Sequence, residues 1–139
     1  MSTRVLLADA HRLMREGLRT LLGKESGMEV VAEAGDGVTA VQLAQDLSPD
    51  VVVIEIGVPG LSGIVATRQI IDEVPGVKVI ALSMYSDRHF VAGMLKAGAS
   101  GYVLKECAFE QLAHAIQAVV AGQVYLSPGV VSVVIEDYM

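Results

Sequence analysis

Four polar side chains lie at the ends of short apolar runs, each of which is typical of a buried strand. They are Asp9, Glu55, Ser83 and Lys105, and Tyr102 lies three residues before Lys105. In open parallel sheets, ligands bind outside the carboxyl ends of the strands, near the point where the strand order reverses. We therefore expect two carboxylates, a hydroxyl and an ammonium to converge on one small crevice.

This set of side chains is suited to handling a phosphoryl group. Carboxylates hold a hard divalent cation such as Mg²⁺, which keeps several waters and needs only one or two protein carboxylates. A lysine neutralises charge on phosphoryl oxygens, and a hydroxyl donates a hydrogen bond to another of them. A central carboxylate would act as the nucleophile and form an acyl phosphate.

The elements that must position these residues alternate along the chain. Short apolar, β-branched runs predict strands at 5–8, 30–34, 51–56, 77–82 and 101–104. Five segments with helical spacing of apolar residues follow them, and Gly98 and Gly122 come where the fourth and fifth helices should stop. Because the strands show no polar alternation, we expect both faces of the sheet to be covered by helices. The sequence therefore predicts an α/β, flavodoxin-like, doubly wound sheet of five parallel strands in the order 2-1-3-4-5.

Composition limits the class of protein. The chain has 139 residues, 53% of them hydrophobic and 19% charged, which indicates one ordinary folded domain. The formal net charge of −6 argues against binding nucleic acid or an anionic membrane through bulk charge. The single cysteine, Cys107, excludes an internal disulfide, and no apolar run approaches the roughly 18 residues of a membrane span. We expect a cytoplasmic protein without a membrane partner.

The C-terminal segment differs from the rest. Residues 1–122 account for the five strand–helix units, and 123–139 contain Ser127-Pro128, a favourable helix start, followed by apolar residues around most of the helix. This helix either folds back onto its own domain or awaits another domain or subunit. A valine-rich helix is a poor solitary helix, so the sequence favours the second alternative.

Several stretches resemble a known family, the receiver domain of bacterial two-component response regulators, of the LuxR/NarL (FixJ-like) transcriptional type with a CheY-like fold. These stretches are 4–18, 49–63, 81–84 and 97–106, and residues 125–128 resemble the start of the connection to a helix-turn-helix domain.

The resemblance implies roles for individual residues. Asp9 matches the first residue of an acidic pair near the metal, and the backbone carbonyl of Gly57 falls where the family supplies a metal ligand. Ser83 matches the hydroxyl that senses phosphorylation, Lys105 the phosphate-contacting lysine, and Tyr102 the rotating aromatic switch.

Two positions depart from the family pattern. Ala10 stands where a second acidic metal ligand is expected, and Glu55 stands at the phosphoacceptor aspartate. Alanine removes a hard oxygen, while glutamate moves the carboxylate outward by about 1.5 Å, one C–C bond. A misplacement of about 1 Å costs on the order of 10²-fold in rate when attack must be in line. We expect weak or absent Mg²⁺ binding at Asp9, Glu55 and Gly57, with Glu55 reaching instead toward Lys105 and Ser83.

The sequence thus predicts a degenerate receiver domain and not an enzyme. It would act by homodimerisation through the fifth and terminal helices, and would control a DNA-binding domain that lies outside this chain. An alternative is a phosphorylation-competent receiver served by a sensor histidine kinase. A flavin-binding enzyme is disfavoured, because the residues after the first strand, 10–14, form no phosphate-binding loop.

Simpler interpretations exist for single residues. Asp9 alone would be a helix N-cap, and Lys105 alone a solvated surface lysine. His11 is expected to lie exposed on the loop after the first strand, and Cys107 to be an inert thiol. Three methionines are expected to fill the core: Met14, Met84 and Met94.

Overall fold

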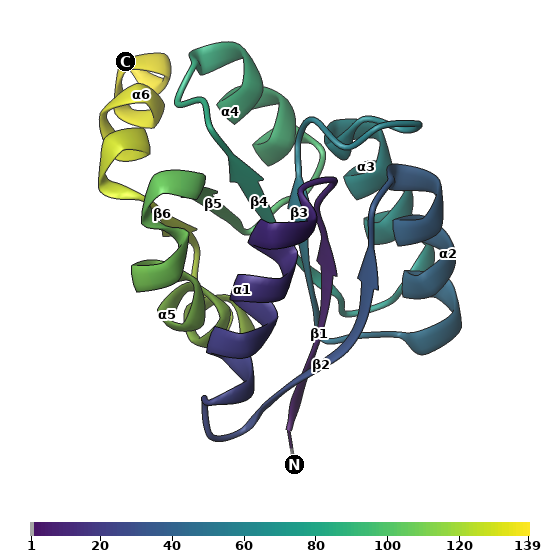
Figure 1. Ribbon diagram of the computed structural model, residues 1–139. Coiled ribbons are helices and arrows are strands. Elements are labelled where there is room, and N and C mark those ends of the chain that lie inside the picture. The colour runs from purple at the N-terminus through teal and green to yellow at the C-terminus, as the bar shows by residue number, and fades with distance from the viewer. Residues whose placement is uncertain (1) are drawn as a thin grey trace.

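A parallel sheet forms the centre of the molecule, and the carboxyl ends of its strands point toward one end (Figure 1). The computed structural model describes residues 2–139. The strands are β1 (Thr3–Ala8), β2 (Met28–Ala34), β3 (Val51–Glu55), β4 (Lys78–Ser83), β5 (Gly101–Leu104) and β6 (Tyr125–Leu126). Their order in the sheet is β2-β1-β3-β4-β5-β6, which confirms the predicted arrangement of the first five strands and adds a short sixth strand.

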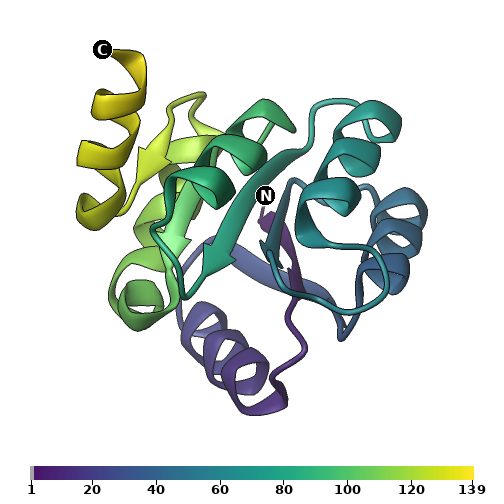
Figure 2. The ribbon, with the colours of Figure 1, turned by 90° about the horizontal axis from the view of Figure 1, so that it is seen from above.

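Helices follow each of the first five strands. They are α1 (Arg12–Gly23), α2 (Gly37–Leu47), α3 (Gly63–Glu73), α4 (Arg88–Lys96) and α5 (Ala108–Val120), with a 3₁₀ turn η1 (Lys105–Cys107) before α5. Viewed from above, α1 and α5 cover one face of the sheet, and α2, α3 and α4 cover the other (Figure 2). No helix in residues 2–139 combines the length and the apolar character needed to cross a lipid bilayer.

The sheet carries a separate apolar core on each face. Leu18 and Leu22 of α1 pack with Leu112 and Ile116 of α5 on one face. Small side chains such as Ala40 and Ala66 bring α2 and α3 close to the other face. The central strands are buried on both faces as predicted, but β2 is half exposed, because it is an edge strand with a neighbour on one side only.

The parallel register places the site residues beside one another. Ala8 pairs with Ile54, so Asp9 and Glu55 emerge next to each other at the end of β1 and β3. Ser83 of β4 pairs with Leu104 of β5, so Lys105, the residue after Leu104, lies just past Ser83 at the same edge of the sheet. Residues 46 positions apart in the chain are thereby adjacent at one edge of the sheet.

The terminal helix α6 (Pro128–Tyr138) packs against α4 and does not stand apart, contrary to the alternative that the sequence favours. Val130 is fully buried, and Val133 and Val134 pack against the core. Ser127 begins the helix, but its hydroxyl donates to Gln111 Oε1 and accepts from the Leu104 N–H, and so ties the segment to β5 and α5. The opposite face of α6 remains exposed.

One methionine prediction is wrong. Met94 is fully buried and Met14 packs partly against the core, whereas Met84 is 62% exposed. Met84 follows the last residue of β4, where the chain has left the sheet and the helices no longer cover it.

Gly63 at the start of α3 lets this helix approach the end of β3. A Cβ at this position would lie 2.6 Å from the carbonyl oxygen of Glu55 and 2.6 Å from the Cα of Ile56, both backbone atoms that cannot move aside cheaply. We expect Gly63→Ala to lower the free energy of unfolding by about 1–3 kcal/mol, measured by urea denaturation.

Gly23→Ala is the matched control, because a Cβ there meets nothing within 4 Å and alanine is the better helix former. It should be neutral or slightly stabilising. If Gly63→Ala and Gly23→Ala change the free energy of unfolding equally, the backbone near Gly63 can move aside without loss of stability, and the prediction is wrong.

Candidate functional site

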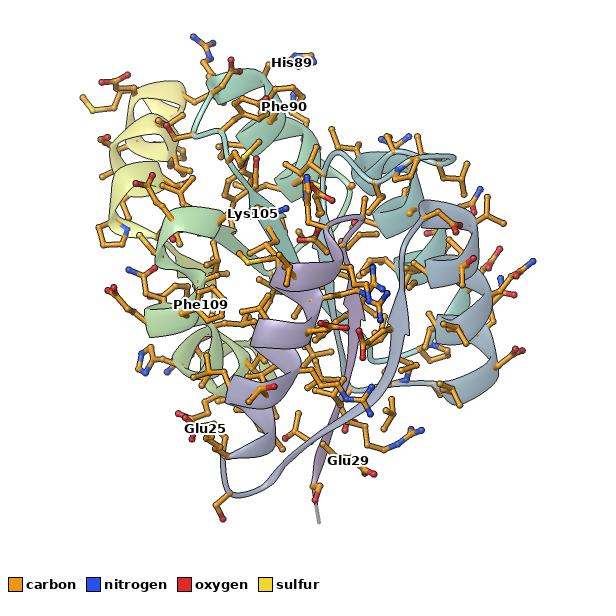
Figure 3. All side chains as sticks on the ribbon, in the orientation of Figure 1. Glu25, Glu29, His89, Phe90, Lys105 and Phe109 are labelled. Atoms are coloured by element: carbon orange, nitrogen blue, oxygen red, sulfur yellow. The ribbon has the colours of Figure 1, made fainter. Side chains whose placement is uncertain are left out.

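The candidate site lies at the carboxyl ends of β1, β3 and β5, where Lys105 bridges two carboxylates. Its Nζ atom lies 2.9 Å from Asp9 Oδ2 and 2.9 Å from Glu55 Oε2. All three side chains are nearly buried, with exposed fractions of 10% for Lys105, 3% for Asp9 and 9% for Glu55. Lys105 projects from the end of β5 toward this point (Figure 3). It is not the solvated surface lysine of the simpler interpretation.

Backbone groups fix the two carboxylates. Glu55 Oε1 accepts a hydrogen bond from the Ala10 N–H at 3.1 Å, which leaves Oε2 for Lys105. Asp9 Oδ1 accepts from the His11 N–H at 2.7 Å, and its carbonyl accepts from Arg15 Nη1 at 2.6 Å. The helix cap position itself belongs to His11, so Asp9 is not the N-cap of α1.

Arg15 also ties the loop after β1 to the edge strand, because its Nε donates to Glu33 at 3.0 Å. Burial tends to raise the pKa of the Glu33 carboxyl, but hydrogen bonds from Arg19 and Arg15 hold that pKa below its ordinary value. Glu33 therefore stays ionised and keeps Arg15 in place.

His11 belongs to the site, which sequence reasoning missed. Its ring is exposed as predicted, yet Nδ1 lies 2.9 Å from Lys105 Nζ, 3.1 Å from Asp9 Oδ1 and 3.3 Å from Glu55 Oε2. The sequence did contain a feature that could have predicted this. His11 lies two residues after Asp9, where the turn into a helix can direct a side chain back over the end of the strand.

Ser83 lies beside this cluster, and among the described residues its hydroxyl forms no hydrogen bond with Asp9, Glu55 or Lys105. Its Oγ accepts from the Tyr85 N–H at 3.0 Å, while Ser83, Glu55 and Gly57 line a common pocket of about 340 Å³. The predicted reach of Glu55 toward Lys105 is confirmed, and its reach toward Ser83 is not seen among the bonds of residues 2–139.

Tyr102 is fully buried, and its hydroxyl donates to the Tyr85 carbonyl at 2.6 Å. Burial raises the pKa of the Tyr102 phenol above its ordinary value, so the phenol stays neutral and remains a donor. Ser83 and Tyr102 therefore hold the same residue of the β4–α4 loop, one through its N–H and the other through its carbonyl.

The cluster has the charge to attract a divalent cation, but it fits Mg²⁺ poorly. Asp9, His11 and Glu55 offer donor atoms that all lie within 4.8 Å of one another. Asp9 Oδ2 is buried and accepts no hydrogen bond, although Lys105 pairs with it by charge. Ala10 contributes no oxygen, an imidazole nitrogen stands beside the carboxylates, and the Lys105 ammonium lies where a cation would be expected.

The comparisons with known proteins identify the class. Residues 5–117 match the model of the response regulator receiver domain, and the chain belongs to this family. A solved structure of a LuxR-family two-component response regulator from Aurantimonas sp. SI85-9A1 is similar, with a TM-score of 0.93, 36% identity and 99% coverage of both chains.

Curated relatives are longer than this chain. The transcriptional regulatory protein DegU of Brevibacillus brevis is 40% identical over 134 residues, which cover 96% of this chain and 57% of DegU. The response regulator GacA of Pseudomonas aeruginosa is 37% identical over 125 residues, or 90% of this chain and 58% of GacA. The chain thus spans about three fifths of the length of the curated relatives it matches.

The Lys105–Glu55 pair should stabilise the fold. Lys105→Met leaves two nearly buried carboxylates without a cation, and we expect it to lower the free energy of unfolding by about 3 kcal/mol. A double-mutant cycle with Glu55→Gln, followed by urea denaturation, should give a coupling energy of about 0.5–3 kcal/mol.

The exposed pair Arg12–Glu16 is the control, with side chains 82% and 52% exposed. Its cycle, Arg12→Met with Glu16→Gln, should give at most about 0.5 kcal/mol. A coupling at Lys105–Glu55 no larger than this would contradict the assigned contact.

Proposed function

We propose that this chain is the signal-receiving part of a LuxR/NarL-type transcriptional response regulator in which phosphoryl transfer is slow or absent. The observation that carries the proposal is the bond from Lys105 Nζ to Glu55 Oε2 at 2.9 Å beside an alanine at position 10. The domain would act as a regulatory module and not as an enzyme.

The geometry of Glu55 supports slow transfer. Oε1 accepts from the Ala10 N–H after β1 and Oε2 from Lys105 after β5, so both oxygens are engaged. The carboxylate is one methylene longer than the aspartate that the family uses, so an attacking oxygen would be displaced by about 1.5 Å. In-line attack on a phosphorus atom is sensitive to such a displacement.

Metal binding would be weak for the same reason. In the family, a divalent cation neutralises charge on the phosphoryl group, and here Asp9, Glu55 and the Gly57 carbonyl would have to hold it. The missing oxygen at Ala10 and the competing ammonium of Lys105 both oppose Mg²⁺.

Glu55 would also bias the resting state. It engages Lys105 as a phosphoryl group would, but with one charge and two oxygens, where a phosphoryl group brings about −1.5 to −2 and three oxygens. A full switch requires about 5.5 kcal/mol of differential binding. The resting domain would therefore be partly, not fully, active-like.

Control of DNA binding would pass through a further domain. The relatives include a transcriptional regulatory protein, and the chain matches only part of its length. With a net charge of −6, this domain would leave DNA contacts to the attached one. A sensor histidine kinase remains the proposed phosphodonor should transfer occur.

The decisive experiment is labelling by acetyl phosphate with Mg²⁺, followed by mass spectrometry of the intact chain. The unaltered chain should remain unlabelled, and the double variant Ala10→Asp/Glu55→Asp should be labelled. The double variant restores the missing ligand and shortens the acceptor side chain.

The single variants Ala10→Asp and Glu55→Asp serve as controls. Each should be labelled less than the double variant, because each corrects only one of the two departures from the family pattern. Ready labelling of the unaltered chain would favour the phosphorylation-competent alternative and overturn the proposal.

Homodimerisation would use α5 and α6, which keep apolar side chains exposed. Phe109 and Val120 of α5 are 50% and 47% exposed, and Val131 and Ile135 of α6 are 39% and 52% exposed. Phe109 lies on the side of α5 that faces α1, with its ring beside Gly17 of α1, and half of it remains exposed (Figure 3). The exposed apolar side chains of α6 are not needed for its packing on the domain. Val130, Val133 and Val134 form the inner face of α6, which already packs against the core.

We expect Ile135→Glu to raise the dimer dissociation constant at least about tenfold, equivalent to about 1.4 kcal/mol, in sedimentation velocity experiments. Val38→Glu on α2 is the control, because Val38 is 45% exposed on another helix. A strictly monomeric unaltered chain at high concentration would count against the dimer.

A further inference from the structure

Three donor atoms of different residues converge on one point at the end of β1. Asp9, His11 and Glu55 each offer one donor atom, and these three atoms lie within 4.8 Å of one another; His11 Nδ1 is near both Asp9 Oδ1 and Glu55 Oε2. The carboxylates are nearly buried, whereas the His11 side chain is 60% exposed and leaves a path from solvent. This is a mixed nitrogen and oxygen donor set, which differs from a cluster of acidic residues.

The Lys105 ammonium already acts as a stand-in cation at this point. Nζ lies 2.9 Å from Asp9 Oδ2, from Glu55 Oε2 and from His11 Nδ1. A neutral His11 that accepts from Lys105 directs the lone pair of Nδ1 to the same place. The buried Asp9 Oδ2 also faces this point, and Lys105 Nζ is its partner there.

The spacing of the donors suits short metal–ligand bonds. His11 Nδ1 lies 3.1 Å from Asp9 Oδ1 and 3.3 Å from Glu55 Oε2. Ligands bound tetrahedrally at 2.0–2.2 Å are about 3.3–3.6 Å apart. The two separations therefore need to change by only a few tenths of an ångström.

The ligands are also held in place before any ion arrives. The Ala10 N–H binds Glu55 Oε1 and so directs Oε2 toward Lys105 and His11. The His11 N–H and Arg15 restrain the carboxyl and carbonyl groups of Asp9. The longer side chain at position 55, a defect for phosphoryl transfer, is what brings this carboxylate to the imidazole.

From this geometry we propose that Asp9, His11 and Glu55 bind a zinc-class ion, such as Zn²⁺ or Co²⁺, in preference to Mg²⁺. Imidazole favours Zn²⁺ and its neighbours, whereas Mg²⁺ requires a near-octahedral set of oxygens. Three protein ligands leave a fourth position open to water. The ion displaces Lys105 from the carboxylates, so the two cations compete. The inference goes beyond the proposed function and holds whether or not the domain is phosphorylated.

The test is titration of the full chain with Co²⁺, followed by visible absorption spectroscopy, and with Zn²⁺ by calorimetry. Co²⁺ should give the strong visible bands of a four-coordinate site, Zn²⁺ should abolish them, and excess Mg²⁺ should not. His11→Ala should lower the Zn²⁺ affinity at least about 10–100-fold, the loss seen even when a group that only orients a metal ligand is removed. His89→Ala on α4 is the matched control and should leave the affinity unchanged, because His89 lies away from Lys105 (Figure 3).

Lys105→Ala gives the opposite prediction and separates metal binding from general stability. Removal of the competing ammonium should raise the Zn²⁺ affinity, even though the variant is less stable without metal. The proposal is overturned if Co²⁺ gives only the weak bands of a six-coordinate site, if His11→Ala binds as tightly as the unaltered chain, or if Mg²⁺ displaces Co²⁺. None of these measurements uses a phosphodonor, so their failure is distinct from failure of the labelling experiment.

Discussion

The Lys105 ammonium group neutralises two nearly buried carboxylates at the carboxyl ends of the strands, and the geometry of the site depends on it. Parallel register delivers Asp9 and Glu55 to neighbouring positions, and two carboxylates this close repel each other when they are nearly buried. Lys105, delivered by β5 after its pairing with β4, neutralises them at 2.9 Å. This contact and the Ala10 N–H together orient Glu55.

The replacement of two residues changes what that contact does. The resemblance to the family implies an oxygen ligand at position 10 and a shorter acid at position 55, which would leave room for a cation and a phosphoryl group. Here Ala10 offers only its N–H, which binds Glu55 Oε1, and the longer carboxylate reaches Lys105. Under the proposed function, this ion pair would take part of the space and charge that a phosphoryl group would supply, and the proposed resting bias and metal preference would both follow from this geometry.

The β4–α4 loop connects the site to the exposed helices. Ser83 and Tyr102 hold the two backbone groups of Tyr85, and the pocket of Glu55, Gly57 and Ser83 extends to Phe90 on α4. The inner face of α6 packs on α4, while Arg88 of α4 forms an ion pair with Asp137 of α6 at 2.7 Å. Contacts therefore link Glu55, the β4–α4 loop, α4 and α6.

The sequence alone determined the five strands, their order and the four strand-end residues, because apolar runs and glycine stops are local signals and parallel topology follows from burial on both faces. It also determined the departures at Ala10 and Glu55, which are matters of residue identity. Tertiary structure decided that His11 turns into the cluster, that Met84 is exposed and that α6 packs on α4. Each of these depends on how the chain packs in three dimensions: only the folded register brings Lys105 within 2.9 Å of His11, 94 residues away, and only the assembled core buries Val130.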